Sequence, residues 1–216
     1  MSDHRIHTES DLDRGIAALV AADPRFAALI AKAGRPPLRR RTDGFAGLAS
    51  TVVSQQLSTA SAGAIWGRLA AAFDPVEPAA IIRARKERLA RIGLSGPKIR
   101  ALKEIARAVV RGELALATLG DIDADAAHAA LTAVHGIGPW TADIYLLSCL
   151  GHADAWPAGD LALQEAARLA FALEARPSTR DLRAMSDAWA PWRSAAARLL
   201  WAYYRVKKGG KAVAPV

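Results

Sequence analysis

Two segments of the chain contain residues whose types and spacing could do chemistry. The first is the stretch LTAVHGIGPWTADIY at residues 131–145, where an apolar segment meets Gly136 and Gly138 and a proline then opens a new helix. Glycines on either side of one residue allow positive φ and let another backbone approach closely. The amides of Gly138, Trp140 and Thr141 would point outward from a helix N-terminus, which favours a phosphate group. The spacing predicts an anion-binding turn between two helices, although an ordinary turn between helices has a similar local pattern.

The second segment is the loop PAGDL, which contains Asp160 and precedes an alanine-rich stretch. The simplest role of this aspartate is that of an N-cap. Helix amides hold a carboxylate in place and favour its charged form, so the same group could also face a developing positive charge. Asp143 and Asp154 are weaker candidates for that role. The five histidines and the single cysteine have no ligand-like spacing, so no metal centre is predicted from them.

The rest of the chain is predicted to be almost entirely helical. Alanine is abundant, and the alternation of apolar and polar residues that is typical of strands is nearly absent. Apolar spacing, prolines and glycines predict helices, besides those named above, over residues 11–22, 24–34, 45–72, 78–84, 86–92 and 98–111. The last of these would carry a stripe of cations on one face, formed by Arg100, Lys103, Arg107 and Arg111. Such a stripe is either a solvated face or a surface for phosphates.

Composition limits the classes of protein to which the chain can belong. It has 216 residues, 52% of them hydrophobic, and 29 Lys and Arg against 21 Asp and Glu, for a formal charge of +8. This excess of positive charge favours a polyanionic partner. The lone Cys149 excludes an internal disulfide framework and a cysteine-ligated iron–sulfur cluster. No apolar run is long enough to span a membrane, and the N-terminal residues lack the apolar core of a signal peptide. Together with the lone cysteine, these features predict a protein of a reducing compartment.

Three motifs, in this order along the chain, resemble those of a known family. They are similar to the DNA-3-methyladenine glycosylase II family, the alkylation-repair branch of the helix-hairpin-helix DNA glycosylase superfamily. The resemblance covers about residues 45–205. The three motifs are GIGPWTA at 136–142, PAGDLAL at 157–163 and WAPWRS at 189–194, and two further segments are similar, SQQLS at 54–58 and GLSGPK at 93–98.

The resemblance implies an all-α fold with two helical subdomains that flank a DNA-binding cleft. One subdomain would cover residues 41–147 and end in the helix-hairpin-helix motif at 131–145. The other would be discontinuous, formed by residues 1–40 and 148–216, and would carry the Asp160 loop. The resemblance assigns catalysis to Asp160, as the anion that stabilises a sugar cation and as a general base. Related enzymes that also cleave the DNA strand have a lysine at the position of Trp140, so a monofunctional glycosylase is implied.

The resemblance also implies roles in binding. An alkylated base is cationic, and aromatic rings bind cations, so Trp140, Trp201 and Tyr145 are expected to line a base pocket. Ser194 and Ala197, small residues on the same helix face as Trp201, would leave room for a flat ligand. For the tryptophans, a place in the hydrophobic core remains the alternative. The expected contacts with DNA come from the hairpin, from a wedge in the SQQLS segment and from the cationic stripe, at Gly136, Gly138, Trp140, Thr141, Gln56, Leu57, Arg100 and Lys103.

Leu57 is the expected wedge, with Gln56 beside it, and the alternative is that Leu57 is a core residue of the predicted helix over 45–72. No cofactor is expected to be required. In hairpins of this family, main-chain carbonyls often hold a sodium or potassium ion, here by position those of Thr132, Val134 and Ile137.

The predicted partner is double-stranded DNA that contains alkylated bases, with no membrane partner and with the protein as a monomer. The compartment would be the nucleoid-containing cytoplasm of a bacterium or the nucleus of a eukaryote. Two alternatives stay open: a non-enzymatic helix-hairpin-helix protein that binds damaged DNA, and a glycosylase for oxidised or deaminated bases. The sequence leaves undecided which of 3-methyladenine, 7-methylguanine, 1-methyladenine and hypoxanthine are released.

Overall fold

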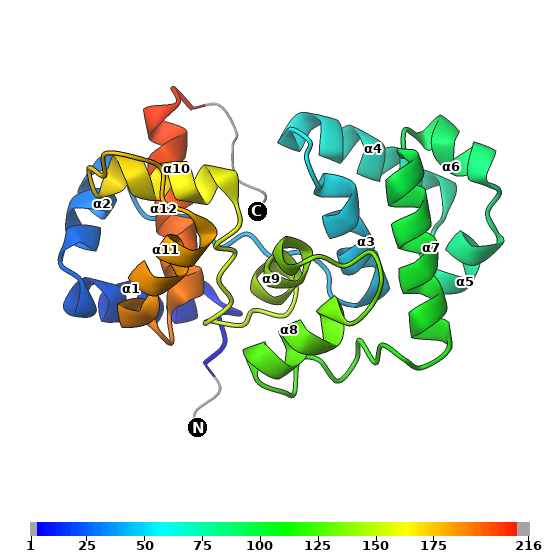
Figure 1. Ribbon diagram of the computed structural model, residues 1–216, viewed down its shortest axis with the longest axis horizontal. Coiled ribbons are helices and arrows are strands. Elements are labelled where there is room, and N and C mark those ends of the chain that lie inside the picture. The colour runs from blue at the N-terminus through cyan, green and yellow to red at the C-terminus, as the bar shows by residue number, and fades with distance from the viewer. Residues whose placement is uncertain (1–3, 211–216) are drawn as a thin grey trace. The chain divides into compact units, whose positions relative to one another are not determined.

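The computed structural model describes residues 4–210. Within that range the chain forms twelve α-helices and one short 3-10 helix, and its only strand-like pairing is an isolated bridge between Arg5 and His152. The prediction of an all-α fold is confirmed. The chain divides into two compact units, which are described separately: a middle unit over Arg41–Leu150, and a second unit formed by the residues up to Arg40 and those from Gly151 onward (Figure 1).

The middle unit is a bundle of seven helices. Helix α7 packs against α3, α5 and α6, while α9 packs against α3 and α8. Its core side chains include Leu48, Leu102, Ile105 and Ile144, none of which exposes any surface. In chain order the helices are α3 (Gly44–Ser54), α4 (Thr59–Ala72), α5 (Pro78–Arg83), α6 (Lys86–Ile92), α7 (Gly96–Val110), α8 (Ala124–Thr132) and α9 (Pro139–Ser148).

The prediction of a single helix over residues 45–72 is wrong. The chain instead leaves α3 after Ser54, turns through residues 55–58 and re-enters a helix at Thr59. Gln56 takes a positive φ of 55°, a conformation that no α-helix contains. Ser58 then caps α4, because its side chain accepts a hydrogen bond from the amide of Ser61 at 3.2 Å. The apolar periodicity is continuous through this segment and conceals the turn.

The second unit is built around α12, which packs on α1, α2 and α10. Its core contains an aromatic cluster in which the ring of Trp189 meets the edges or faces of Phe26, Trp156 and Phe171, with ring centroids 5.2–5.7 Å apart. The helices are α1 (Glu9–Ala22), α2 (Arg25–Ala33), α10 (Leu161–Ala170), α11 (Thr179–Met185), the 3-10 helix η1 (Asp187–Trp189) and α12 (Arg193–Lys207). Among residues 4–210, no helix is both long enough and apolar enough to cross a membrane.

Candidate functional site

The predicted hairpin is present in the middle unit, where α8 and α9 lie side by side and are joined by a short turn (Figure 1). Gly136 has a φ of +97°, the left-handed region that favours glycine. A Cβ atom added at Gly136 would lie 2.8 Å from the Cβ and 2.9 Å from the Cα of Ala101. The turn therefore packs directly on α7, and glycine is required there for both reasons.

Gly138 differs from Gly136. It is the N-cap of α9, its φ is −85°, and a Cβ atom added there would meet nothing within 4 Å. No side chain caps the start of α9, and Pro139 occupies the first turn. A helix N-terminus without a side-chain cap presents amide groups and partial positive charge to an anion. The second glycine thus marks an open approach to the backbone rather than a contact within the fold.

The two helices of the hairpin also bring polar side chains close together. His128 of α8 lies with its Nε2 atom 3.6 Å from Oδ1 of Asp143 in α9. In the turn itself, the amide of Ile137 donates to the carbonyl of Val134 at 3.1 Å. A carbonyl oxygen has two lone pairs, so this bond leaves the Val134 oxygen able to bind a cation as well. Asp143, one of the weaker catalytic candidates, is buried within the hairpin.

Asp160 lies in the second unit, as the N-cap of α10. Its Oδ1 atom accepts hydrogen bonds from the amide of Leu163 at 2.8 Å and from Nε1 of Trp201 at 3.2 Å. The side chain is 8% exposed. The capping role predicted for Asp160 is confirmed, and the carboxylate is fixed by one bond within its own helix and by another from α12.

The loop before Asp160 is held by Gln164, a residue that no sequence motif indicates. The Nε2 atom of Gln164 donates to the carbonyl of Ala158 at 2.9 Å and to Oγ1 of Thr179 at 3.2 Å. Gln164 sits one turn into α10 and has no local motif that would reveal this function. By contrast, Asp154, the other weaker catalytic candidate, forms an ion pair with Arg193, which donates two hydrogen bonds to its carboxylate.

The three aromatic residues expected in the base pocket have different surroundings. Trp140 is half-buried, whereas Trp201 is 2% exposed and Tyr145 is fully buried. Burial raises the pKa of the Tyr145 hydroxyl above its usual range. Ser194 and Ala197, the two small residues expected to leave room beside Trp201, are both fully buried, and the Ser194 hydroxyl donates to the carbonyls of His152 and Ala155.

The wedge candidate is exposed. Leu57 lies in the turn between α3 and α4 with 38% of its surface accessible, so the alternative of a core position is wrong. Gln56, beside it, is held at positive φ. The neighbouring Gln55 connects this turn to the hairpin, because its Nε2 atom donates to Oγ1 of Thr141 in α9 at 2.5 Å.

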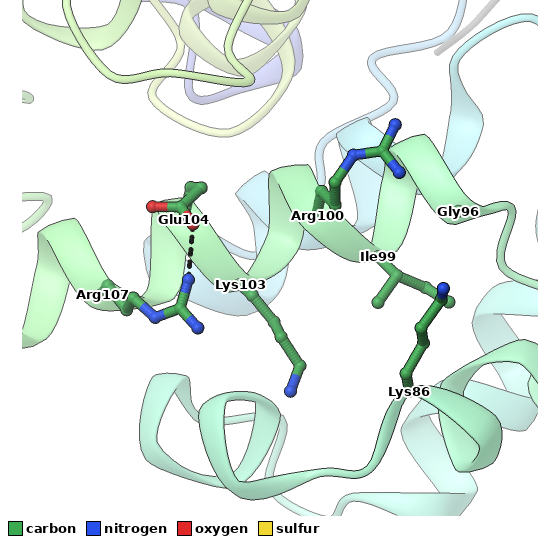
Figure 2. A pocket seen from close by; sticks show the side chains of 7 residues that line it. All are labelled: Lys86, Gly96, Ile99, Arg100, Lys103, Glu104 and Arg107. Carbon is green, nitrogen blue, oxygen red and sulfur yellow. Dashed lines mark hydrogen bonds and ion pairs between the residues drawn. The ribbon is translucent and has the colours of Figure 1, made fainter.

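The cationic stripe follows α7 to its C-cap, Arg111, and its first three cations lie along a pocket of about 220 Å³ (Figure 2). Three of its four cations make contacts within the protein. Lys103 donates to the carbonyls of Ile82 and Ala84 at the end of α5, at 3.1 and 2.7 Å. Arg107 pairs with Glu104, and Arg111 with Glu113. Within residues 4–210, Arg100 alone of the four has no such partner, and it is exposed. The stripe is therefore largely neutralised or structural, with Arg100 as the exception.

Several known proteins are similar to this chain. The chain spans about two fifths of the length of a probable bifunctional transcriptional activator and DNA repair enzyme AlkA from Mycobacterium tuberculosis, at 35% identity over 88% of this chain. It is 30% identical to DNA-3-methyladenine glycosylase 1 of Schizosaccharomyces pombe, over 78% of this chain and 75% of that protein.

Similarity extends to a solved structure from the same yeast, the 3-methyladenine DNA glycosylase Mag1 in complex with abasic DNA. The TM-score is 0.80 at 27% identity, and the match covers 94% of this chain and 98% of the other. The family described as HhH-GPD superfamily base excision DNA repair protein matches residues 49–192, which include the hairpin, the Leu57 turn and the Asp160 loop. With two thirds of its length matched in this way, the chain belongs to the HhH-GPD superfamily of base excision DNA repair proteins.

Proposed function

We propose that the protein is a monofunctional DNA glycosylase that releases N3- and N7-methylated purines from double-stranded DNA. The observation that carries the proposal is the fixed carboxylate of Asp160, whose Oδ1 accepts bonds from Leu163 and Trp201. Besides capping α10, a carboxylate fixed in this way can stabilise positive charge on a sugar, which a protein that only binds damaged DNA does not require. The relatives named as 3-methyladenine glycosylases support the same substrate class.

The hairpin and the Leu57 turn would hold the DNA and expose the damaged base. A base inside a duplex is out of reach of an enzyme, so its nucleotide must be flipped out of the stack. The open backbone at Gly138 and the uncapped start of α9 suit a DNA phosphate. The exposed side chain of Leu57, with Gln56 beside it, suits the space that the flipped base leaves.

Asp160 would act on the sugar. As the N-glycosidic bond breaks, its electrons pass to the cationic base, which leaves neutral, and positive charge develops on the sugar. A fixed anion stabilises this charge electrostatically. The oxygen of a water molecule then bonds to C1′ of the sugar, and one of its protons passes to Asp160, which serves as general base. Trp140 has no nucleophilic amine, so no covalent intermediate with the sugar would form at that position.

The base itself would be recognised by aromatic faces. Trp140 is the one of the three aromatic candidates that exposes an appreciable part of its surface, and an indole is the best ring for a cation. Trp201 donates to Asp160 and so would orient the carboxylate. Tyr145 is a fully buried residue of α9 itself and would support the start of that helix through the core of the middle unit.

The remaining expectations follow from the same activity. A sodium or potassium ion at the carbonyls of Thr132, Val134 and Ile137 would stabilise the hairpin turn and take no part in the chemistry. No other cofactor is needed for hydrolysis. We propose that the protein acts as a monomer, at the nucleoid or in the nucleus.

Release of bases from defined duplexes tests this function. Duplexes that carry 3-methyladenine, 7-methylguanine, 1-methyladenine, hypoxanthine or 8-oxoguanine are incubated with the protein, and free base and strand breaks are measured separately. We expect methylated purines to be released while the strand stays intact until hot alkali is added. Binding without release of any base would favour the damage-binding alternative. Strand cleavage at the rate of base release, or a complex trapped by borohydride, would contradict the absence of lyase chemistry.

A further inference from the structure

The turn that carries Leu57 is held by side chains from two other helices. Lys98 of α7 extends its ammonium group to the carbonyls of Val53 and Gln55, at 2.7 and 2.8 Å. The side chain of Gln55 in turn donates to Oγ1 of Thr141, in the first turn of α9, at 2.5 Å. The turn is thus tied to α7 by Lys98 and to the hairpin helix by Gln55.

The main-chain hydrogen bonds within the turn are long. Its own main-chain hydrogen bonds, from Gln55 to Val52 and from Leu57 to Ser54, are both 3.3 Å long. Gln56 keeps a positive φ, which costs free energy unless the surroundings enforce it. The last carbonyls of a helix lack partners within that helix, and Lys98 supplies one for two of them. Burial lowers the pKa of Lys98, a cost that its two charge-assisted bonds offset.

We propose that Lys98 and Gln55, together the turn anchor, are positioning residues that hold Leu57 ready for insertion into the duplex and couple it to the hairpin. This inference rests on the proposed function, in which Leu57 fills the space of the flipped base. Neither residue of the anchor needs to touch the reacting atoms. Insertion unstacks base pairs, and a wedge on a loose turn would lose part of the free energy needed for that step.

The coupling follows from where Thr141 lies. It is 1% exposed and belongs to the same helical turn whose amides are offered to a DNA phosphate. Gln55 bonds to its hydroxyl directly. A phosphate bound at the start of α9 and a wedge at Leu57 would therefore be held in a fixed register by one short hydrogen bond.

A double-mutant cycle tests the proposal. The variants are Lys98→Met, which keeps the aliphatic stem and removes the ammonium, Leu57→Ala, and the two combined. Two readouts are used: single-turnover release of 7-methylguanine, and the fluorescence of 2-aminopurine placed beside an abasic-site analogue, which rises when the wedge unstacks it. We expect Lys98→Met to lower both by about tenfold, the size of a lost charge-assisted hydrogen bond. In the Leu57→Ala background the same change should have almost no further effect.

Lys103→Met is the matched control. Lys103 is on the same helix and also donates to two carbonyls at the end of a preceding helix, but that helix is α5 and not the wedge turn. Its effect on either readout should be the same with and without Leu57. Lys98→Arg should restore part of the lost signal, because a guanidinium also donates to carbonyls. Gln55→Met should lower the 2-aminopurine fluorescence, as Lys98→Met does.

The outcomes separate the anchor from the function on which it rests. If the wild-type protein releases base and the effects of Lys98→Met and Leu57→Ala are additive, the proposed function stands and the anchor is refuted. If the wild-type protein releases no base, the proposed function fails. The double-mutant cycle read by 2-aminopurine fluorescence then still shows whether Lys98 acts through Leu57. A Leu57→Ala variant that unstacks the probe as well as the wild type would overturn the anchor. Thermal melts of all variants show whether a loss of signal merely follows a loss of folding.

Discussion

The two glycines of the hairpin should respond in opposite ways to the same added methyl group. In Gly136→Ala the new Cβ would lie 2.8 Å from the Cβ and 2.9 Å from the Cα of Ala101, at a φ of +97°. Strained backbone and overpacking each cost about 1–3 kcal/mol, so we expect a loss of at least about 2 kcal/mol of stability. In Gly138→Ala the methyl group meets nothing within 4 Å, and the loss should stay within about 1 kcal/mol.

Binding to DNA should show the reverse pattern. If a phosphate approaches the backbone at Gly138, the methyl group of Gly138→Ala should weaken binding by about tenfold, the size of one lost charge-assisted hydrogen bond. Urea denaturation gives the stabilities, and fluorescence anisotropy with a duplex containing an abasic-site analogue gives the affinities. Wild-type affinity in Gly138→Ala, with folding intact, would refute the close approach of DNA at this turn. Wild-type stability in Gly136→Ala would refute the packing of the turn on α7.

Two further predictions concern charge. Arg100→Gln should weaken DNA binding and reduce the slope of log K against log salt by about one, whereas Lys103→Gln should lower stability and leave that slope unchanged, as titrations at several salt concentrations would show. Burial raises the pKa of Cys149 to about 11. Unfolding therefore releases its proton between the ordinary value and pH 11, so stability should fall with rising pH in that window, by at most about 1.4 kcal/mol per pH unit. Denaturant melts of Cys149→Ala should lack this loss of stability with rising pH. The same pH dependence in the wild type and in Cys149→Ala would contradict the raised pKa of Cys149.

The hairpin and the capping role of Asp160 could be predicted because their signals are local. Gly136 and the proline after Gly138 define the turn within a few residues, and Asp160 caps the helix that follows it. An N-cap and a glycine at positive φ depend on the adjacent backbone, so residue types at fixed offsets are sufficient to reveal them.

The features that escaped prediction depend on distant contacts. The break in the expected helix over 45–72 is stabilised by Lys98, 45 residues beyond Val53, and by Thr141, 86 residues beyond Gln55. Likewise, Lys103 was expected on a DNA-binding stripe, yet it completes the end of α5 about twenty residues earlier in the chain. Periodicity in one segment carries no information about which distant carbonyl a lysine will reach.

The proposed reaction depends most on the negative charge of Asp160. Asp160→Asn keeps an oxygen that can accept the bonds from Leu163 and Trp201, and asparagine is as good an N-cap as aspartate, so stability should change by no more than about 1 kcal/mol. The matched control is Asp123→Asn, because Asp123 caps α8 through a bond from Ala126 at 2.9 Å and has no proposed part in the reaction.

Single-turnover release of 7-methylguanine by Asp160→Asn therefore tests the central claim most directly. We expect the rate to fall by at least about a hundredfold, the effect of removing one preorganised electrostatic group, with affinity for the lesion duplex retained. Asp123→Asn should release base at the wild-type rate. Undiminished release by folded Asp160→Asn would contradict the account.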